Sequence, residues 1–235
     1  GTRAKRVSRT RKPDDMSLEA WQIALRRQFA ADQDFRVKNI GDEPVFSEFQ
    51  VTNPGTKRTY RVAIRGEGLG VNYCSCPDYA TNTLGTCKHI EFLLGRLRRK
   101  RGGRRALVAG YHPPFSEVYL RYGAQRAVMF RAGTECPASL RRRAGKYFDG
   151  DGVLRPAAVR GFHTFLEQAG EDAHEVRCYD DALAFLSRLR DDAERVERIG
   201  RAFPAGLRSA AWAGLLNADL YPYQREGALF AAKAG

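Results

Sequence analysis

Apolar residues near the start of the chain recur at the spacing of an amphipathic helix. Leu18, Trp21, Leu25 and Phe29 follow one another at intervals of three and four residues, which places them on one face of a helix. Ser17 precedes them, and serine is a favoured N-cap residue. The pattern predicts a helix that begins after Ser17 and turns this apolar face toward a core.

The next stretch changes to the two-residue period of β-strands. Residues 46–52, 58–64 and 71–73 alternate between apolar and polar side chains, which is typical of strands with one buried face. Asn-Pro-Gly at 53–55 and the glycine-rich segment 66–70 separate them, and such residues favour tight turns. The pattern predicts a small antiparallel meander.

A helix and a second module are predicted beyond the meander. Residues 90–97 have the spacing of an amphipathic helix that runs into a basic stretch. Glycines at 102 and 103 and prolines at 113 and 114 indicate a boundary. The second module is expected to contain a hairpin of 117–122 and 126–131, helices from Pro137 and over 156–168, a strand over 176–179 and a helix from Asp180.

This order of elements predicts an α+β fold made of a small antiparallel meander with a helix, followed by a second α+β module. The expected divisions are a basic tail over 1–16, a first domain over 17–105, an α+β accessory module over 106–215 and a final segment over 216–235.

Composition narrows the class of protein. Hydrophobic residues make up 43% of the chain and aromatic residues 11%, which is enough for a core and excludes a wholly disordered chain. No stretch approaches the length of apolar sequence that a membrane span needs, so we expect no membrane partner. The N-terminal residues lack the apolar segment of a secretory signal, and five cysteines do not suit a disulfide framework. These features favour a reducing, intracellular compartment.

Positive charge is concentrated in the first half of the chain, although the formal net charge of the whole is +13. Residues 1–110 hold 22 Lys and Arg against 11 Asp and Glu, whereas residues 111–235 hold 18 against 16. A field of this kind attracts polyanions, above all nucleic acid. The alternative is that the scattered arginines lie on ordinary solvated faces.

The densest of three basic runs lies at 96–105, between the tail and a third run at 141–146. Cations this close repel one another unless an anion offsets them, so this run is the candidate for contact with DNA phosphates. Phosphate contacts supply affinity without sequence preference. The predicted contact residues, called the basic run below, are Arg96, Arg98, Arg99, Lys100, Arg101, Arg104 and Arg105.

Cys74, Cys76, Cys87 and His89 fall within sixteen residues of one another. Three thiolates and one imidazole complete a tetrahedral Zn²⁺ site and leave no position for a reactive water. Residues two apart in a strand point to the same side, so Cys74 and Cys76 can share an ion. Residues two apart in a helix do not, so we expect Cys87 just before a helix and His89 in its first turn.

This cluster predicts one structural zinc ion, which would staple the meander to the following helix. The alternative is two buried structural cysteines, one incidental cysteine and a surface histidine. The spacing Cys-x-Cys, ten residues, Cys-x-His resembles the SWIM zinc finger over roughly residues 45–100, and all four ligand positions match. The resemblance implies a ββα-type zinc module proposed to bind DNA or proteins. Such modules occur in bacterial Swi/Snf-class ATPases, MuDR-type transposase proteins and some relatives of ubiquitin ligases.

A second resemblance lies at 220–228. The sequence Leu-Tyr-Pro-Tyr-Gln-Arg-Glu-Gly-Ala resembles the Q-motif-like segment that opens the ATPase core of Swi/Snf-type superfamily 2 translocases. It implies that 216–235 begins such a core and that Gln224 faces the adenine of ATP in a full-length protein. The phosphate loop of that family is not found in these residues, because Gly145-Lys146 is followed by Tyr147. We therefore expect no catalytic residues and no ATP hydrolysis in this chain.

Together the resemblances imply the non-catalytic N-terminal region of a bacterial Swi/Snf-family helicase or translocase, in which a zinc module contributes DNA binding and regulates the motor. The implied partners are DNA, the ATPase core of the same full-length chain and, less directly, another protein. The implied location is the bacterial cytoplasm, on the nucleoid. The alternative function is a protein-interaction adaptor whose zinc finger docks a partner, with the basic runs incidental.

Overall fold

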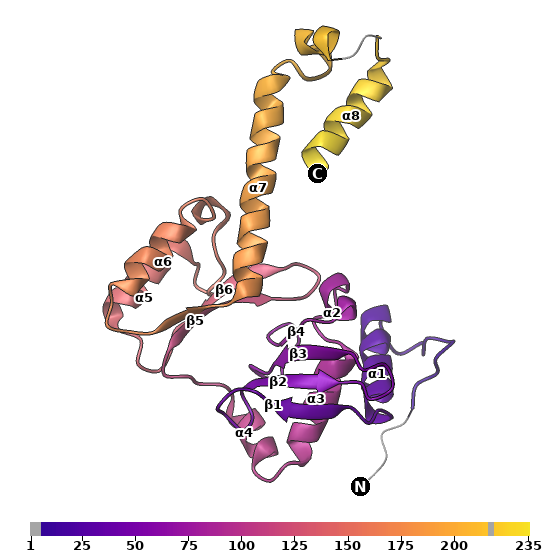
Figure 1. Cartoon of the computed structure of the whole chain (residues 1–235), viewed down its shortest axis with the longest axis vertical. Helices are drawn as coiled ribbons and strands as arrows, with labels where there is room; N and C mark the ends of the chain where they lie inside the picture. Colours follow the sequence, from indigo (N-terminus) through magenta and orange to yellow (C-terminus); the bar gives the residue numbers. More distant parts are fainter. Residues whose placement is uncertain (1–5, 216–218) are drawn as a thin grey trace.

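The computed structural model describes residues 6–215 and 219–235. Within these ranges the chain forms eight α-helices, three short 3-10 helices and two sheets of four and three strands. The predicted α+β class is confirmed. Figure 1 shows the first sheet and its helices at one end of the molecule, the second sheet in the middle and a long helix leading away from it.

The first sheet is the antiparallel meander that the alternating pattern predicts, with one additional strand at its edge. Val51 pairs with Tyr60, and Val62 pairs with Cys74. Phe49, Val51 and Val62 are buried, so one face of the meander supplies the first core. In the order in which they pair, the strands are β1 (Arg36–Asn39), β2 (Glu48–Thr52), β3 (Thr59–Ala63) and β4 (Tyr73–Cys74).

Helices cover this sheet and contact one another. α3 packs against both α1 and α4 and also contacts β4. Ile90, Leu93 and Leu97 of α3 join the core of the meander, together with Leu107 of α4. The helices are α1 (Leu18–Ala31), α2 (Pro77–Thr81), α3 (Lys88–Arg99) and α4 (Gly103–Ala109).

α1 begins where the sequence predicts, but its predicted apolar face is not the buried one. Leu18 and Phe29 are 51% and 40% exposed, whereas Ala30 is buried. The Trp21 side is covered by the preceding segment rather than by the core, because its indole N–H donates to the Ser8 carbonyl at 2.8 Å. The basic tail, described from residue 6 onward, therefore runs beside α1 without helix or strand of its own. The rest of that predicted tail lies outside the described residues.

α4 is a helix that the sequence pattern does not predict. The pair Gly102-Gly103 is expected to end the first module, yet Gly103 is the first residue of α4. Gly102 has a φ of 75°, which favours glycine. A Cβ on Gly103 would overlap the carbonyl of Leu97. The two glycines thus allow a close turn between two packed helices, rather than a flexible boundary.

The second sheet has the order β6-β5-β7, formed by β5 (Ser116–Arg121), β6 (Ala127–Arg131) and β7 (Val176–Cys178). The predicted hairpin is confirmed as the antiparallel pair of β5 and β6, and β7 pairs in parallel with β5. Val118, Leu140, Phe148 and Phe165 lie in the second core. The helices of this module are α5 (Ala138–Tyr147), α6 (Phe162–Gly170) and α7 (Asp180–Ala202).

The prediction of one continuous helix over 156–168 is wrong, because the structure divides this segment into two helices. A 3-10 helix, η1 (Pro156–Ala158), is followed by α6, which begins only after Gly161. Gly161 has a non-helical backbone at this position, and glycine disfavours a helix interior. The break brings both Phe162 and Phe165 into the second core.

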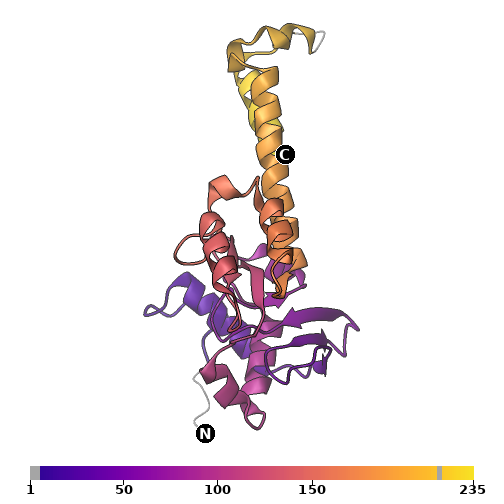
Figure 2. The same cartoon turned by 90° about the vertical axis from the view of Figure 1, so that its left-hand side faces the viewer.

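α7 leads away from the second sheet as an arm in both Figure 1 and Figure 2. Beyond it lie the 3-10 helices η2 (Gly206–Arg208) and η3 (Ala210–Gly214), and then α8 (Pro222–Ala234), which packs back along α7. The Arg195 guanidinium donates to the Lys233 carbonyl at 3.4 Å. Among the described helices, none has the length and apolarity needed to cross a membrane.

Candidate metal centre

The first module brings Cys74, Cys76, Cys87 and His89 into one buried cluster. Cys74 is the last residue of β4, and Cys76 is the N-cap of α2. Cys87 is the N-cap of α3 and His89 lies in its first turn, which is the arrangement that the spacing predicts. The four residues converge because the end of β4 and the starts of α2 and α3 meet at one point.

The distances suit one metal ion. One ligand atom from each residue can be chosen so that all four lie within 4.8 Å of one another. His89 Nδ1 is 3.8 Å from Cys74 Sγ and 4.0 Å from Cys87 Sγ. Ligand atoms at the usual Zn–S and Zn–N lengths of a tetrahedral site lie roughly 3.5–3.8 Å apart. The cluster therefore fits a single ion with small adjustments, and Nδ1 is the histidine atom best placed to bind it.

The cluster is closed to solvent. None of the four residues is more than 3% exposed, and no cysteine of the described chain forms a disulfide. Three sulfurs and one nitrogen would fill the coordination of a tetrahedral ion. An ion in this position could hold the fold together but could not present a water to a substrate.

A backbone N–H group and two aromatic rings support the ligands. The Tyr79 N–H donates to Cys76 Sγ at 3.4 Å. This donor lies at the start of α2, where unpaired N–H groups stabilise negative charge. The His89 ring is held between Phe35 and Tyr60, whose centroids lie 5.2 and 4.8 Å from it.

The three sulfurs differ in acidity. Hydrogen bonds from Cys74 and Cys87 lower the pKa of Cys76, whereas hydrogen bonding to Cys76, with burial, raises the pKa of Cys74. Burial is the main cause that raises the pKa of Cys87. Burial of the cluster opposes negative charge on Cys74 and Cys87, so binding of a metal ion must be accompanied by loss of thiol protons.

No known protein family, curated protein or solved structure matches this chain. The resemblances to SWIM fingers and Swi/Snf translocases therefore rest on the residues of their motifs.

The basic run lies on the same helix as the metal cluster and continues beyond it. All seven of its residues are exposed. Arg96, Arg98 and Arg99 occupy the last turn of α3, and the remaining four lie in the turn and in the start of α4. Arg98 forms an ion pair with Glu67 at 2.8 Å, so its charge is partly offset. The run is therefore a bent surface over two packed helices, rather than one extension.

Gln224 has a structural role in α8. Its side-chain oxygen accepts a hydrogen bond from the Tyr221 N–H at 3.0 Å, which forms a capping box at the start of the helix. Of the segment predicted to open an ATPase core, residues 216–218 lie outside the described residues. The adenine contact of Gln224 stays a prediction.

The second module contains a groove that is not predicted from the sequence. This groove has a volume of about 640 Å³ and lies between the hairpin, the segment 153–160 and α7. Its walls come from three stretches separated by up to several tens of residues, so no local motif could reveal it. Four arginines among its lining residues are the one sequence signal, and they lie outside the predicted basic runs.

Proposed function

We propose that this chain is a non-catalytic module that holds one structural Zn²⁺ at Cys74, Cys76, Cys87 and His89 and contacts DNA phosphates through the basic run. The observation that carries the proposal is the course of α3. This helix begins directly after Cys87, carries His89 in its first turn and ends at Arg99. A metal ion at its start would fix the direction of the cations at its end.

Zinc is the proposed ion because of its ligands. Thiolates and imidazole are soft or borderline donors, which suit Zn²⁺ better than Mg²⁺ or Ca²⁺. The strands at the edges of the first sheet are short. β4 has only two residues and β1 only four. Small sheets bury too little apolar surface to hold together alone, and a structural zinc ion supplies several kcal/mol or more.

DNA is the proposed partner because most of the exposed cations of the basic run form no ion pair with a described carboxylate. Among the described residues, Arg98 is the one member of the basic run with an ion pair to a carboxylate. If about four to six phosphates are neutralised, the slope of log affinity against log salt on duplex DNA is roughly −4 to −5. Such binding depends steeply on salt and little on sequence.

The test is a quadruple variant, Arg98→Ala, Arg99→Ala, Lys100→Ala and Arg101→Ala. Its binding to duplex DNA should weaken and its salt slope should shrink by several units, while zinc content and circular dichroism stay unchanged. A matched control removes four exposed arginines of α7 and lowers the net charge equally. The control residues are Arg188, Arg190, Arg198 and Arg201.

If the basic-run variant and the wild type have the same DNA affinity and salt slope, the basic run is not the DNA-binding surface. The tail or residues 141–146 would then have to provide any DNA binding. If neither protein binds DNA, the adaptor function, in which the zinc finger docks a protein partner, takes its place.

At a finer level, we propose that the module is a SWIM-type finger in the N-terminal region of a bacterial Swi/Snf-family translocase, acting in the cytoplasm on the nucleoid. The ligand spacing and the segment 220–228 support this assignment. The ATPase core of a full-length chain would supply ATP binding, with Gln224 at the adenine. ATP hydrolysis by the present chain should be undetectable. Hydrolysis that depends on this chain would contradict the assignment.

A further inference from the structure

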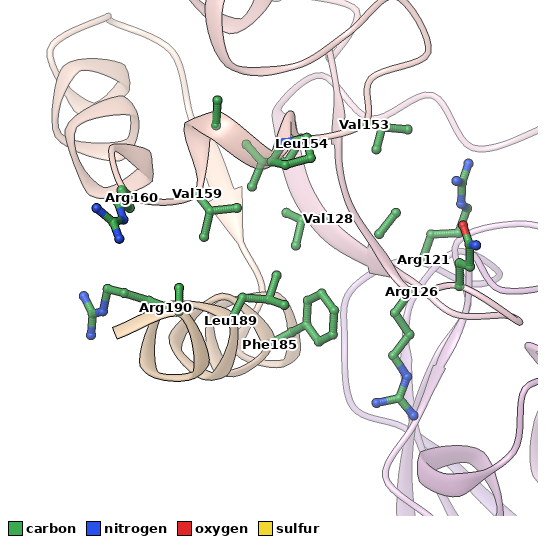
Figure 3. A pocket seen from close by; sticks show the side chains of 15 residues that line it. Arg121, Arg126, Val128, Val153, Leu154, Val159, Arg160, Phe185, Leu189 and Arg190 are labelled. Atoms are coloured by element: carbon green, nitrogen blue, oxygen red, sulfur yellow. The ribbon is translucent and has the colours of Figure 1, made fainter. Parts of the chain in front are cut away.

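The groove of the second module has an apolar centre. Val128 of β6, Leu154 and Val159 line it on one side, and Phe185 and Leu189 of α7 line it on the other. Figure 3 shows these side chains turned toward one another across the groove. The volume of about 640 Å³ lies within the range of sites that bind ligands or peptide side chains. Leu189 is 37% exposed, so apolar surface is open to solvent here.

Arginines mark the two ends of this apolar centre. Arg160 and Arg190 lie together at one end, and Arg121 and Arg126 lie at the other (Figure 3). No Asp or Glu is among the described residues that line the groove. The only other polar lining residue is Gln125. Arginine side chains therefore flank an apolar centre at both ends of the groove.

Three of these arginines are either without an ion pair or held only in exposed ones. Within the described chain, Arg121 has no carboxylate within ion-pair distance, whereas Arg190 forms long, exposed ion pairs with Glu194 at 3.9 Å and Asp191 at 4.0 Å. Arg160 pairs with Glu197 at the surface, where both side chains stay largely exposed. Exposed pairs of this kind are weak and exchange readily. Arg126 differs, since it donates to the Ala80 carbonyl and lies over the Tyr122 ring.

We propose that this groove binds an acidic peptide segment of a partner protein, with one or two large apolar side chains at its centre and carboxylates on both sides. Charge complementarity selects this occupant, because arginine forms bidentate hydrogen bonds with carboxylates. Nucleic acid fits less well, because the centre is mostly aliphatic and bases bind single-strand sites by stacking on aromatic rings. This site is separate from the proposed metal and DNA surfaces.

The probe is a displayed library of random peptides about twelve residues long, which is enough to cover a peptide-binding groove. The library is selected on the full chain, and enriched peptides are synthesised for affinity measurement. We expect enriched sequences that combine a large apolar residue with Asp or Glu on either side. Their affinity should fall as salt increases.

Two variants and two matched controls test the location. Leu189→Glu and Arg121→Glu should each weaken binding of the enriched peptides roughly tenfold or more, since the loss of an important interface contact has effects of that size. Leu183→Glu changes a leucine of α7 with nearly the same exposure, 38%, outside the groove. Arg188→Glu likewise reverses an exposed charge on α7 outside it. Both controls should bind as the wild type does.

Three results would overturn the proposal. The first is no enrichment, or enrichment of peptides without carboxylates. The second is equal affinity of all four variants for the enriched peptides. The third is displacement of the peptides by a single-stranded oligonucleotide from the wild type but not from Arg121→Glu, which would assign the groove to nucleic acid.

Discussion

The backbone N–H of Tyr122 donates a 2.9 Å hydrogen bond to the carbonyl oxygen of Gly70. Tyr122 follows β5 in the hairpin of the second sheet, and Gly70 precedes the ligand cysteines. The Tyr122 ring also lies 4.4 Å from that of Tyr79, whose N–H supports Cys76. On its other side, the Tyr122 hydroxyl donates to Asp181 of α7 at 3.0 Å. The hairpin therefore connects the region of the cysteine and histidine cluster to the arm.

Gly70→Ala should destabilise the whole chain by about 2–4 kcal/mol. The added methyl group would strain the backbone at residue 70 and push it away from Tyr122. Gly70 has a φ of 79°, and an added Cβ would overlap the Tyr122 carbonyl. Gly68→Ala is the control, because its Cβ would meet only Val71 at an ordinary 3.9 Å. Thermal or urea unfolding of the two variants measures the difference. Equal midpoints would show that the contact between the modules contributes nothing.

Arg27→Met should cost about 1–3 kcal/mol, because it leaves a buried carboxylate without its cation. Glu91 is only 3% exposed in its side chain and accepts from Arg27 at 2.9 Å and from the Thr86 hydroxyl at 2.8 Å. Arg160→Met removes an exposed partner, that of Glu197, and should change the stability little. Unfolding midpoints of both variants test this. The same small effect in both would mean that the Arg27–Glu91 pair contributes no more to stability than an exposed ion pair.

Treatment with a strong chelator should make three of the five thiols reactive toward a thiol reagent. Cys74, Cys76 and Cys87 are shielded in the zinc-bound state and become accessible when the first module opens. Mass spectrometry of labelled protein counts the reactive sites. As a control, Cys178→Ser should keep the zinc and Cys76→Ser should lose it, since only the second variant removes a ligand. Three reactive thiols before chelation would contradict a closed site.

Alkylation of Cys178 should be slow until strongly alkaline pH. Burial raises the pKa of Cys178 to about 12, with Asp181 adding to the effect, so little reactive thiolate forms near neutrality. The unfolded chain loses this proton at lower pH, so the contribution of Cys178 to stability is complete below the unfolded pKa and is lost as pH rises toward about 12. Rates with iodoacetamide in native and unfolded chains give the comparison. Equal rates at pH 8.5 would contradict the burial of this thiol.

Local patterns predict the meander, the second hairpin and the arrangement of the metal ligands, because each depends on neighbours in sequence. Alternation over 46–52 and 58–64 fixes which residues of β2 and β3 face the core, and the spacing of Cys87 and His89 requires a helix start between them. These features could be predicted from the sequence alone.

Features that depend on contacts between distant segments could not. Leu18 and Phe29 have helical spacing, yet the tail beside Trp21 and the packing of Ala30 decide which face of α1 is buried. Gly103 begins a helix at a point where the Leu97 carbonyl leaves no room for a Cβ, although a glycine pair more often marks a break. The groove likewise depends on β6, the segment 153–160 and α7, which line it together although they are far apart in the sequence.

The zinc content of protein purified without added metal tests the central claim most directly. Elemental analysis should give one zinc ion per folded chain, and its removal should unfold the meander as well as the loop between Cys76 and Cys87. The same measurement on Cys76→Ser should give almost none. Well-folded wild-type protein with a zinc content near zero would contradict the account, because the cluster would then be a group of buried thiols without a metal.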